Sequence, residues 1–261
     1  MAQKNFSIRI LDKIPSFNKT IKCDSDKSQS IRSFLIGSIS QNISLAKNVL
    51  ESEDVKSAIT ACRRLGVKIE RLKPQSYKIF GKGLGSFFIK KNSTLDFGNS
   101  GTLARLLIGI LTSTPNIEVN LKGDHSLNKR SMKKLIDLMS EFGASFFPKE
   151  KYKFPLKMIS TDYPIGINYR AGVSAQLKSA VILAGLNAFG KTEILEKEKS
   201  RDHTENMLLS SDTIKIKRKK IRTISVFGKR PLNRFDINIP GDPSSAAFFT
   251  TLALLNKKSK L

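Results

Sequence analysis

The feature that most constrains this chain is a pattern that occurs four times along it. In each copy a short polar segment with small residues runs into an apolar stretch, and successive copies are 70 to 74 residues apart. A serine at the junction can cap a helix, and the polar residues ahead of it lie at the helix end that carries partial positive charge. Helix N-termini that point toward one site bind phosphate or carboxylate groups. The copies are SQSIRSFLIG, SGTLARLLIG, SAQLKSAVILAG and SSAAFFTTLA, which open at Ser28, Ser100, Ser174 and Ser244.

Helices and strands also repeat between these copies. Residues 51–67 and 129–144 have the apolar spacing of amphipathic helices and end near Gly66 and Gly143, which suit left-handed C-caps. A shorter third helix is expected from Ser200. The units are α+β repeats of roughly seventy residues, longer than the solenoid periods of 20–50. Strands are predicted at SIRIL from Ser7, VKIE from Val67, YKIF from Tyr77, IEVNLKG from Ile117, TISVFG from Thr223 and FDINIPG from Phe235.

Length and composition favour a globular protein of the reducing cytosol. The 261 residues, 39% of them hydrophobic, can bury a core in one large or two ordinary domains. The opening MAQKNFSIRILDK has no apolar signal-peptide core, and no run approaches the ~18–20 apolar residues of a membrane-spanning helix. Cys23 and Cys62 lack metal-ligand spacing, and His125 and His203 stand alone. We therefore expect a soluble cytoplasmic protein without a zinc site or a disulfide framework.

The formal net charge of +24 has more than one explanation. Such an excess suggests nucleic-acid binding, because neutralisation of phosphates drives that association. The lysines are scattered, however, and the main dense run, KIKRKKIR at residues 215–222, alternates with apolar residues. That run predicts a strand with a solvated basic face. A Lys-rich proteome, attraction of an anionic small molecule and adventitious RNA binding all stay open.

The first polar segment, DSDKSQSIR, places a cation where a helix is already positive. Lys27 falls beside the N-terminus of the predicted helix, which is unfavourable unless an anion binds there too. A phosphate or carboxylate held by Lys27, the Ser28 hydroxyl and Arg32 would resolve this, because a guanidinium can engage two oxygens at once. The alternative is an ion pair between Asp26 and Lys27, with Arg32 facing water. This segment alone does not separate the two.

Two later segments offer neutral groups to a ligand. In LDFGNSGTLARLL, Gly98 and Gly101 let the backbone approach a ligand closely, and Asn99 supplies a side-chain donor. In SAQLKSA, Ser174 adds a hydroxyl and Gln176 an amide. A simple capped helix would explain either segment taken alone.

Cations stand at further predicted helix starts. Lys129 and Arg130 follow one another in GDHSLNKR, and Arg201 occupies a comparable position in SRDHTE. Each is electrostatically misplaced in the same sense as Lys27. Cations at three helix starts together therefore indicate a site for anionic groups.

These segments together resemble the enolpyruvyl transferase family over essentially the whole chain. The resemblance implies that the 5-hydroxyl of shikimate 3-phosphate adds to C2 of phosphoenolpyruvate, after which the tetrahedral intermediate loses phosphate, on the shikimate pathway to chorismate. It implies no metal and no organic cofactor, and a monomer whose partners are small molecules rather than nucleic acid or a membrane. The motifs are DKSQSIR, LDFGNSGTLARLL, GDHSLNKRSM, SAQLKSAVILAGL, SRDHTENML and PGDPSSAAFF.

The resemblance also implies roles for particular residues. Arg130 would grip the phosphate of phosphoenolpyruvate. Two departures from the family pattern, Ile31 where histidine is usual and Ser131 where proline is usual, bear on fine geometry and remove no assigned contact. The contacts implied for phosphoenolpyruvate are Lys27, Asn99, Gly101, Arg130 and Gln176, and those implied for shikimate 3-phosphate are Lys27, Ser28, Arg32, Ser174, Ala175, Gln176, Ser200 and Arg201.

The fold implied by the resemblance is α/β, a two-domain inverse α/β barrel with helices inside, sheets outside and three α+β repeats in each domain. Residues 21–239 are expected to form one complete three-repeat domain, while residues 1–20 and 240–261 belong to a first domain that is truncated. The catalytic acid and base carboxylates of the family are expected in a C-terminal part outside this chain. No catalytic residue is therefore assigned, and the 261 residues alone are expected to be inactive.

Three alternatives stay open. The amino-sugar enolpyruvyl transferase shares the repeat but lacks SAQLKSA and SRDHTE in this form, and its loop cysteine has no counterpart near Arg130. A basic nucleic-acid-binding protein built of α+β repeats would account for the net charge, and its binding would weaken steeply with salt. A catalytically inactive fragment would differ from the main interpretation only in activity.

Overall fold

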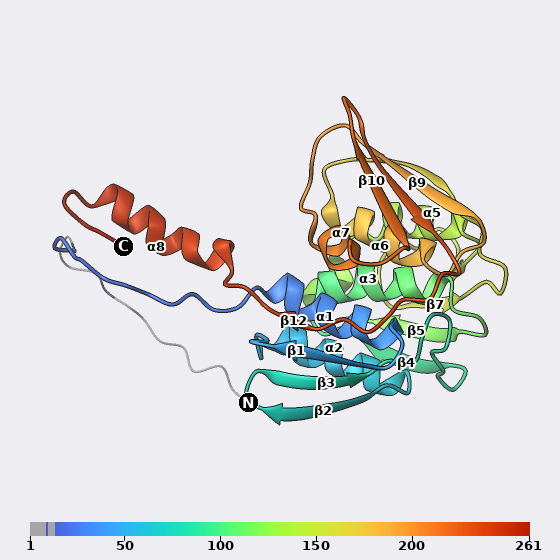
Figure 1. Ribbon diagram of the computed structural model, residues 1–261. Helices are drawn as coiled ribbons and strands as arrows, with labels where there is room; N and C mark the ends of the chain where they lie inside the picture. Colours follow the sequence, from blue (N-terminus) through green and yellow to red (C-terminus); the bar gives the residue numbers. More distant parts are fainter. Residues whose placement is uncertain (1–8, 10–13) are drawn as a thin grey trace. The chain divides into compact units, whose positions relative to one another are not determined.

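The computed structural model describes residue 9 and residues 14–261. It divides the chain into two compact units (Figure 1). The larger is Asp26–Ile239, and the smaller combines Pro240–Leu261 with the residues up to Ser25. The larger unit contains every strand and all helices but one of the part described.

The larger unit repeats one sheet topology three times. Its strands are β1 (Ile43–Lys47), β2 (Lys68–Lys73), β3 (Ser76–Phe80), β4 (Ser93–Asp96), β5 (Glu118–Lys122), β6 (Ser145–Phe147), β7 (Leu156–Ile159), β8 (Asn168–Ala171), β9 (Lys191–Glu196), β10 (Ile214–Arg218), β11 (Arg222–Phe227) and β12 (Ile237–Asn238). The sheet orders are β12-β1-β3-β2, β4-β5-β7-β6 and β8-β9-β11-β10, with the first two strands of each parallel and the other neighbours antiparallel. Because β12 returns from the end of the unit to pair with β1, the last segment completes the first repeat.

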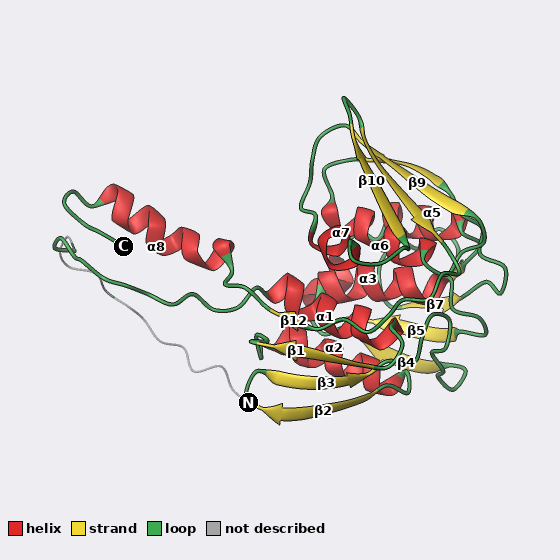
Figure 2. Ribbon diagram, in the orientation of Figure 1, coloured by secondary structure: helices red, strands yellow, loops and turns green. Residues whose placement is uncertain are grey.

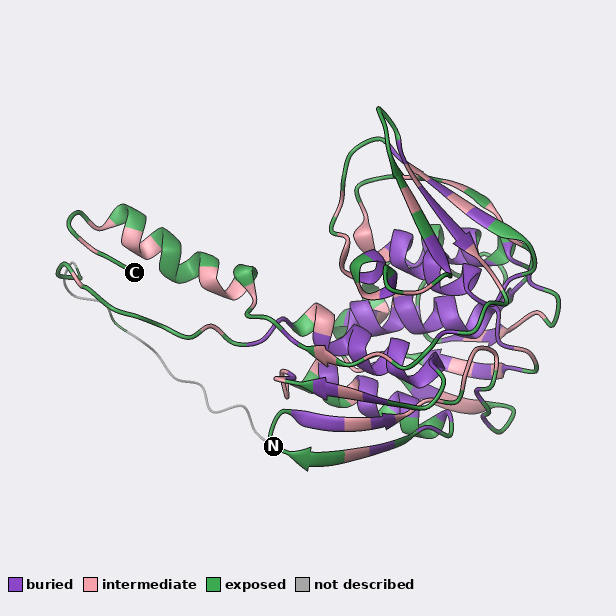
Figure 3. Ribbon diagram, in the orientation of Figure 1, coloured by how far each residue is buried: buried purple, intermediate pink, exposed green. Residues whose placement is uncertain are grey.

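Three apolar helices form the centre of the unit: α1 (Lys27–Ile39), α3 (Gly101–Thr112) and α6 (Ala175–Gly185). After the first turn almost every residue of each is buried, as Figure 3 shows. The three helices are thus buried on all sides, Arg32 of α1 and Lys178 of α6 included, and the sheets lie around them (Figure 2). Helices α3 and α6 pack closely at Gly109, where a Cβ atom would lie 2.5 Å from the carbonyl oxygen of Ala180.

The remaining helices of the larger unit are α2 (Glu53–Arg64), α4 (His125–Lys129), α5 (Lys133–Glu141) and α7 (His203–Leu208). Helices α2, α5 and α7 confirm the helices predicted within residues 51–67, within residues 129–144 and after Ser200. The predicted placement of Lys129 and Arg130 at a helix start is wrong, because Lys129 ends α4 and Arg130 is its C-cap, where a cation is favourable. Gly66 has φ +86° and Gly143 has φ +108°, so the predicted left-handed conformation at both helix ends is confirmed.

The predicted serine caps are confirmed in two copies of the repeat. The Ser100 hydroxyl accepts a hydrogen bond from the N–H of Leu103 at 3.3 Å, and the Ser174 hydroxyl accepts one from Leu177 at 3.4 Å. These caps satisfy N–H groups that have no partner within the helix.

The predicted caps at Ser28 and Ser244 are wrong. Asp26 caps α1 by accepting from the N–H of Gln29 at 2.7 Å, and Asp242 accepts from the N–H of Ser244 at 2.8 Å. An aspartate two residues ahead of the serine starts the helix earlier, and its negative charge suits the positive helix end. Ser28 therefore lies inside the first turn of α1.

Most predicted strands are confirmed, as β2, β3, β5, β11 and β12. The strand predicted over SIRIL lies outside the described residues except for Arg9. The basic run 215–222 is not a single solvated strand, because β10 ends at Arg218 and Arg222 opens β11 after a turn. Lys215 and Lys217 are exposed, but Arg222 is buried.

The smaller unit contains the helix α8 (Pro243–Leu255) and two isolated bridges, Ser25 with Gly241 and Asn18 with Lys260. No residue of α8 is buried, and Phe248 and Leu254 are each 80% exposed. Within residue 9 and residues 14–261, the structure has no helix with the length and apolar character needed to cross a membrane.

Candidate active site

An open pocket of about 390 Å³ lies where the first turns of α1, α3 and α6 come together. We call it the Gly101 pocket. It contains all five residues that the resemblance connects with phosphoenolpyruvate, although they come from separate segments of the chain. Three cations and one carboxylate are among the residues that line it, so the pocket is positively charged and suits an anion. The lining residues are Lys27, Asp54, Asn99, Gly101, Thr102, Arg105, Arg130 and Gln176.

Lys27 is the first residue of α1, and a carboxylate from α2 holds its side chain. The ammonium nitrogen lies 2.9 Å from Oδ2 of Asp54. The alternative in which Lys27 pairs with Asp26 is wrong, because Asp26 is buried and its carboxylate caps the helix instead. The lysine side chain is 46% exposed and faces the Gly101 pocket, where an incoming anion can reach it.

Two guanidinium groups flank the Gly101 backbone. A Cβ atom at this glycine would lie 2.8 Å from Nη1 of Arg105 and 3.2 Å from Nη1 of Arg130. Arg130 donates to Oδ1 of Asn99 at 3.1 Å, and Arg105 donates to the carbonyl oxygen of Gly101 at 3.1 Å. Burial, and then the charge of Arg130, lowers the pKa of Arg105. Two cations this close are stabilised by a shared anion.

Gln176 ties the first turn of α6 to α3. Its Oε1 accepts from Arg105 at 2.9 Å, and its Nε2 donates to Oγ1 of Thr102 at 2.9 Å. Ser174 caps the same helix and lines, with Gln176, a neighbouring pocket of about 430 Å³. Ala175 is the first residue of the helix, half-buried beside them.

Arg32 lies one turn along α1 and is buried. Its Nε donates to Oγ1 of Thr204 at 2.8 Å, Nη1 to the carbonyl oxygen of Ser28 at 3.0 Å, and Nη2 to Oγ of Ser179 at 3.1 Å. Burial lowers the pKa of Arg32 to about 10. The alternative in which Arg32 faces water is therefore wrong. Three of its five N–H groups have neutral partners, which leaves the others for an anionic ligand.

Ser200 and Arg201 lie in the loop between β9 and α7, and neither lines the Gly101 pocket. Both donors of Ser200 go to Oε1 of Glu196, the N–H at 2.9 Å and the hydroxyl at 2.8 Å. Arg201 is exposed. Burial has the largest effect on the pKa of Arg32, the carboxylates of Asp26 and Glu205 come next, and the positive charge of Arg201 lowers that pKa further. The exposed Arg201 guanidinium is therefore near enough to the buried Arg32 guanidinium to lower the pKa of Arg32.

Sequence reasoning missed three residues of the Gly101 pocket, Asp54, Thr102 and Arg105. Arg105 had a visible signal, since it is the one charged residue in TLARLLIGIL and follows Gly101 by one helical turn. Asp54 had none, because only the packing of α2 against α1 brings it to Lys27.

Comparison with known proteins places this arrangement in a family. The family model of EPSP synthase (3-phosphoshikimate 1-carboxyvinyltransferase) matches residues 11–260. A 3-phosphoshikimate 1-carboxyvinyltransferase of Novosphingobium aromaticivorans is 41% identical over 240 residues, covering 90% of this chain and 54% of that protein. One of Rhodopseudomonas palustris is 39% identical over 254 residues, covering 95% of this chain and 57% of that protein.

A solved structure shows the same fold. The EPSP synthase of Acinetobacter baumannii has a TM-score of 0.81 and 35% identity to this chain, and the match covers 92% of this chain and 54% of that one. The chain thus spans about half the length of the relatives it matches. The predicted mixed α/β fold and the resemblance to enolpyruvyl transferases are both confirmed. The chain belongs to the EPSP synthase family.

Proposed function

We propose that this chain binds phosphoenolpyruvate and shikimate 3-phosphate, as part of an enzyme that transfers the enolpyruvyl group to the 5-hydroxyl of shikimate 3-phosphate and releases phosphate. The observation that carries the proposal is the Gly101 pocket, which gathers its lining residues from five separate segments. Such a gathering of cations serves a substrate that carries both a phosphate and a carboxylate.

In the proposed complex, phosphoenolpyruvate lies against the Gly101 backbone, near Asn99 and Gln176. Arg130 grips its phosphate, with Arg105 beside it, and the missing side chain at Gly101 keeps the space between the two guanidinium groups open. Lys27 contacts both substrates from the first turn of α1. Fixed cations of this kind stabilise negative charge that develops during the reaction without having to reorganise.

We further propose that shikimate 3-phosphate lies along the first turns of α1 and α6. Ser28 and Arg32 contact it from α1, Ser174, Ala175 and Gln176 from α6, and Arg201 approaches its phosphate together with Ser200. The Ser28 hydroxyl is inside the first helical turn rather than at the cap, and within the described residues it has no hydrogen-bond partner, so it is free to bind a ligand.

The wider setting forms part of the same proposal. We assign Asp26–Ile239 to the complete three-repeat domain, close to the expected 21–239, and the remaining residues to the other domain. The protein is proposed to act in the cytoplasm as a monomer, without a metal or organic cofactor, on small molecules rather than on nucleic acid or a membrane. Both cysteines, Cys23 and Cys62, are free thiols, as suits a reducing compartment.

The Gly101 position leads to a prediction about glyphosate, the herbicide that occupies the phosphoenolpyruvate site in this family. The active enzyme is expected to be glyphosate-sensitive and to become tolerant as Gly101→Ala, because the added methyl group would displace the Arg105 and Arg130 guanidinium groups. Inhibition constants of the two forms test this. Gly172→Ala is the matched control, since a Cβ there meets nothing within 4 Å. Equal inhibition of wild type and Gly101→Ala would show that the site is elsewhere.

A second prediction concerns the 261-residue chain alone, which spans about half the length of its relatives. It is expected to bind shikimate 3-phosphate weakly and to release no phosphate when phosphoenolpyruvate is added, because closure of a second domain assembles the remaining groups and excludes water. Calorimetric titration followed by a phosphate assay tests both halves. A folded chain that ignores shikimate 3-phosphate, or one that binds RNA with steep salt dependence, would contradict the proposed function.

A further inference from the structure

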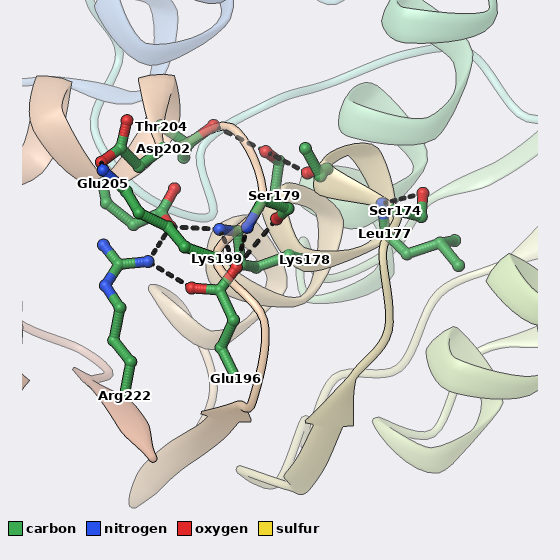
Figure 4. Close-up of polar contacts among 12 residues, drawn as sticks. Ser174, Leu177, Lys178, Ser179, Glu196, Lys199, Asp202, Thr204, Glu205 and Arg222 are labelled. Atoms are coloured by element: carbon green, nitrogen blue, oxygen red, sulfur yellow. Dashed lines mark hydrogen bonds and ion pairs between the residues drawn. The ribbon is translucent and has the colours of Figure 1, made fainter. Parts of the chain in front are cut away.

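Behind the first turn of α6 lies a buried cluster of four charged side chains that the proposed reaction does not use directly. Lys178, Glu196 and Glu205 are at most 1% exposed, and Arg222 is 9% exposed. The Lys178 ammonium nitrogen lies 2.6 Å from Glu196 and 2.7 Å from Glu205, and Arg222 contacts both carboxylates, as Figure 4 shows. The cluster joins α6, the end of β9, α7 and the start of β11.

The cluster reaches the proposed substrate site through Ser200. Its N–H and its hydroxyl both donate to Oε1 of Glu196. A serine hydroxyl has one proton to donate, and a phosphate dianion offers only acceptors. As long as both donors are directed at Glu196, Ser200 has none for a phosphate.

The neighbouring residue of α6 fixes Arg32 in a similar way. The Ser179 hydroxyl accepts from Nη2 of Arg32 at 3.1 Å and from the hydroxyl of Thr204 at 2.8 Å, and Thr204 in turn accepts from Nε of Arg32. Lys178 and Ser179 therefore connect one turn of α6 to two places, the Ser200 loop and Arg32. The same helix carries Gln176, which lines the Gly101 pocket, two residues before Lys178.

Glu196 is a charged acceptor at every pH at which the enzyme would work. Burial alone would raise its pKa, but hydrogen bonds from Lys178, the Ser200 N–H and Arg222 outweigh burial and hold the pKa at about 2. Hydrogen bonds to an ionised carboxylate are roughly twice as strong as neutral ones. The Ser200 backbone is therefore firmly held.

We propose that Glu196 is a positioning residue of the shikimate 3-phosphate site, which fixes Ser200 through both of its donors and so holds Arg201 beside Arg32 to receive the substrate phosphate. Ser200 then acts through its position and not as a phosphate ligand. The inference rests on the proposed function and refines the role of one residue in it.

Hydrogen exchange of the unliganded chain tests the structural half of this inference. Glu196→Gln is expected to speed amide exchange of residues 197–204 by about tenfold or more, since hydrogen bonds to a charged group are lost. Glu193→Gln on the same strand is the matched control, because Glu193 is partly exposed and its carboxylate contacts Lys191 and the Ser225 hydroxyl rather than the Ser200 loop. Unchanged exchange in Glu196→Gln would overturn the inference. If that variant does not fold, Ser200→Ala, which removes only the hydroxyl bond, takes its place with a smaller increase expected.

Shikimate 3-phosphate affinity tests the functional half through a double-mutant cycle. Glu196→Gln should weaken binding by about tenfold or more, whereas Ser200→Ala should weaken it less and add little in the Glu196→Gln background. In the complete reading frame, KM for shikimate 3-phosphate should rise while KM for phosphoenolpyruvate stays unchanged. If the losses of affinity in Glu196→Gln and Ser200→Ala multiplied in the double variant, Ser200 would bind the phosphate directly, and the inference would be overturned.

The hydrogen-exchange and affinity experiments distinguish a failure of this inference from a failure of the proposed function. A wild-type chain that does not bind shikimate 3-phosphate would contradict the proposed function, and the exchange experiment would still decide whether Glu196 holds the Ser200 loop. If the Glu196→Gln variant bound shikimate 3-phosphate as tightly as the wild type, only the role of Glu196 would be contradicted.

Discussion

Lys27→Ala is expected to lower turnover by two to three orders of magnitude in the protein made from the complete reading frame, while the fold persists. The substitution removes a cation proposed to contact both substrates and leaves Asp54 as an unpaired carboxylate in the pocket. Loss of one partner in such a charge pair costs roughly 2–5 kcal/mol. Steady-state kinetics, with circular dichroism to verify folding, measures the effect.

Two further variants make the Lys27 prediction specific. Lys56→Ala is the matched control, because Lys56 is 60% exposed on α2 and pairs only with Glu53. The double variant Lys27→Ala with Asp54→Asn should recover part of the lost affinity, since it removes the repelling carboxylate. Near-normal kinetics of Lys27→Ala would mean that Lys27 is a surface lysine paired with Asp54 and nothing more.

Arg130→Ala is expected to raise KM for phosphoenolpyruvate by about a hundredfold, with a much smaller effect on shikimate 3-phosphate. A guanidinium that engages a phosphate forms charge-assisted hydrogen bonds, the stronger class in proteins. Arg130 is exposed and its observed partner is the Asn99 amide oxygen, so little folding energy depends on it. Initial rates at varied concentrations of each substrate measure the split.

Lys129→Ala provides the comparison for Arg130, because it is the adjacent exposed cation at the end of α4. It should leave both KM values nearly unchanged. If Arg130→Ala and Lys129→Ala behaved alike, the general positive charge of the chain, rather than a specific contact, would account for the affinity for phosphoenolpyruvate.

Most helices and strands of the larger unit could be predicted from the repeat in the sequence. Apolar segments of helical length predicted the buried helices α1, α3 and α6. Gly66 and Gly143 predicted where α2 and α5 end. The caps were harder to place, since Asp26 and Ser28 are both good capping residues two positions apart and only the backbone decides between them. The basic run 215–222 predicts a solvated Arg222, whereas the residue is buried, because its carboxylate partners Glu205 and Glu196 are 17 and 26 residues away in sequence.

In the candidate site, too, the residues at helix starts could be predicted from the sequence, whereas their contacts could not. Residues in motifs that begin a helix, such as Lys27, Gly101 and Gln176, were found from sequence because the helix start itself signals an anion site. Their contacts could not be predicted. Asp54 meets Lys27 only after α2 packs on α1, and Glu196 meets Ser200 only after the chain turns beyond β9.

The most direct test of the proposed function is the reaction itself, in the protein made from the complete reading frame. Phosphoenolpyruvate and shikimate 3-phosphate are supplied together and singly, and both phosphate release and formation of the enolpyruvyl ether are followed. We expect one phosphate released for each shikimate 3-phosphate converted to its enolpyruvyl ether, and none when either substrate is omitted. Phosphate release that does not depend on shikimate 3-phosphate, or no release from a folded protein that holds both substrates, would contradict the proposed function.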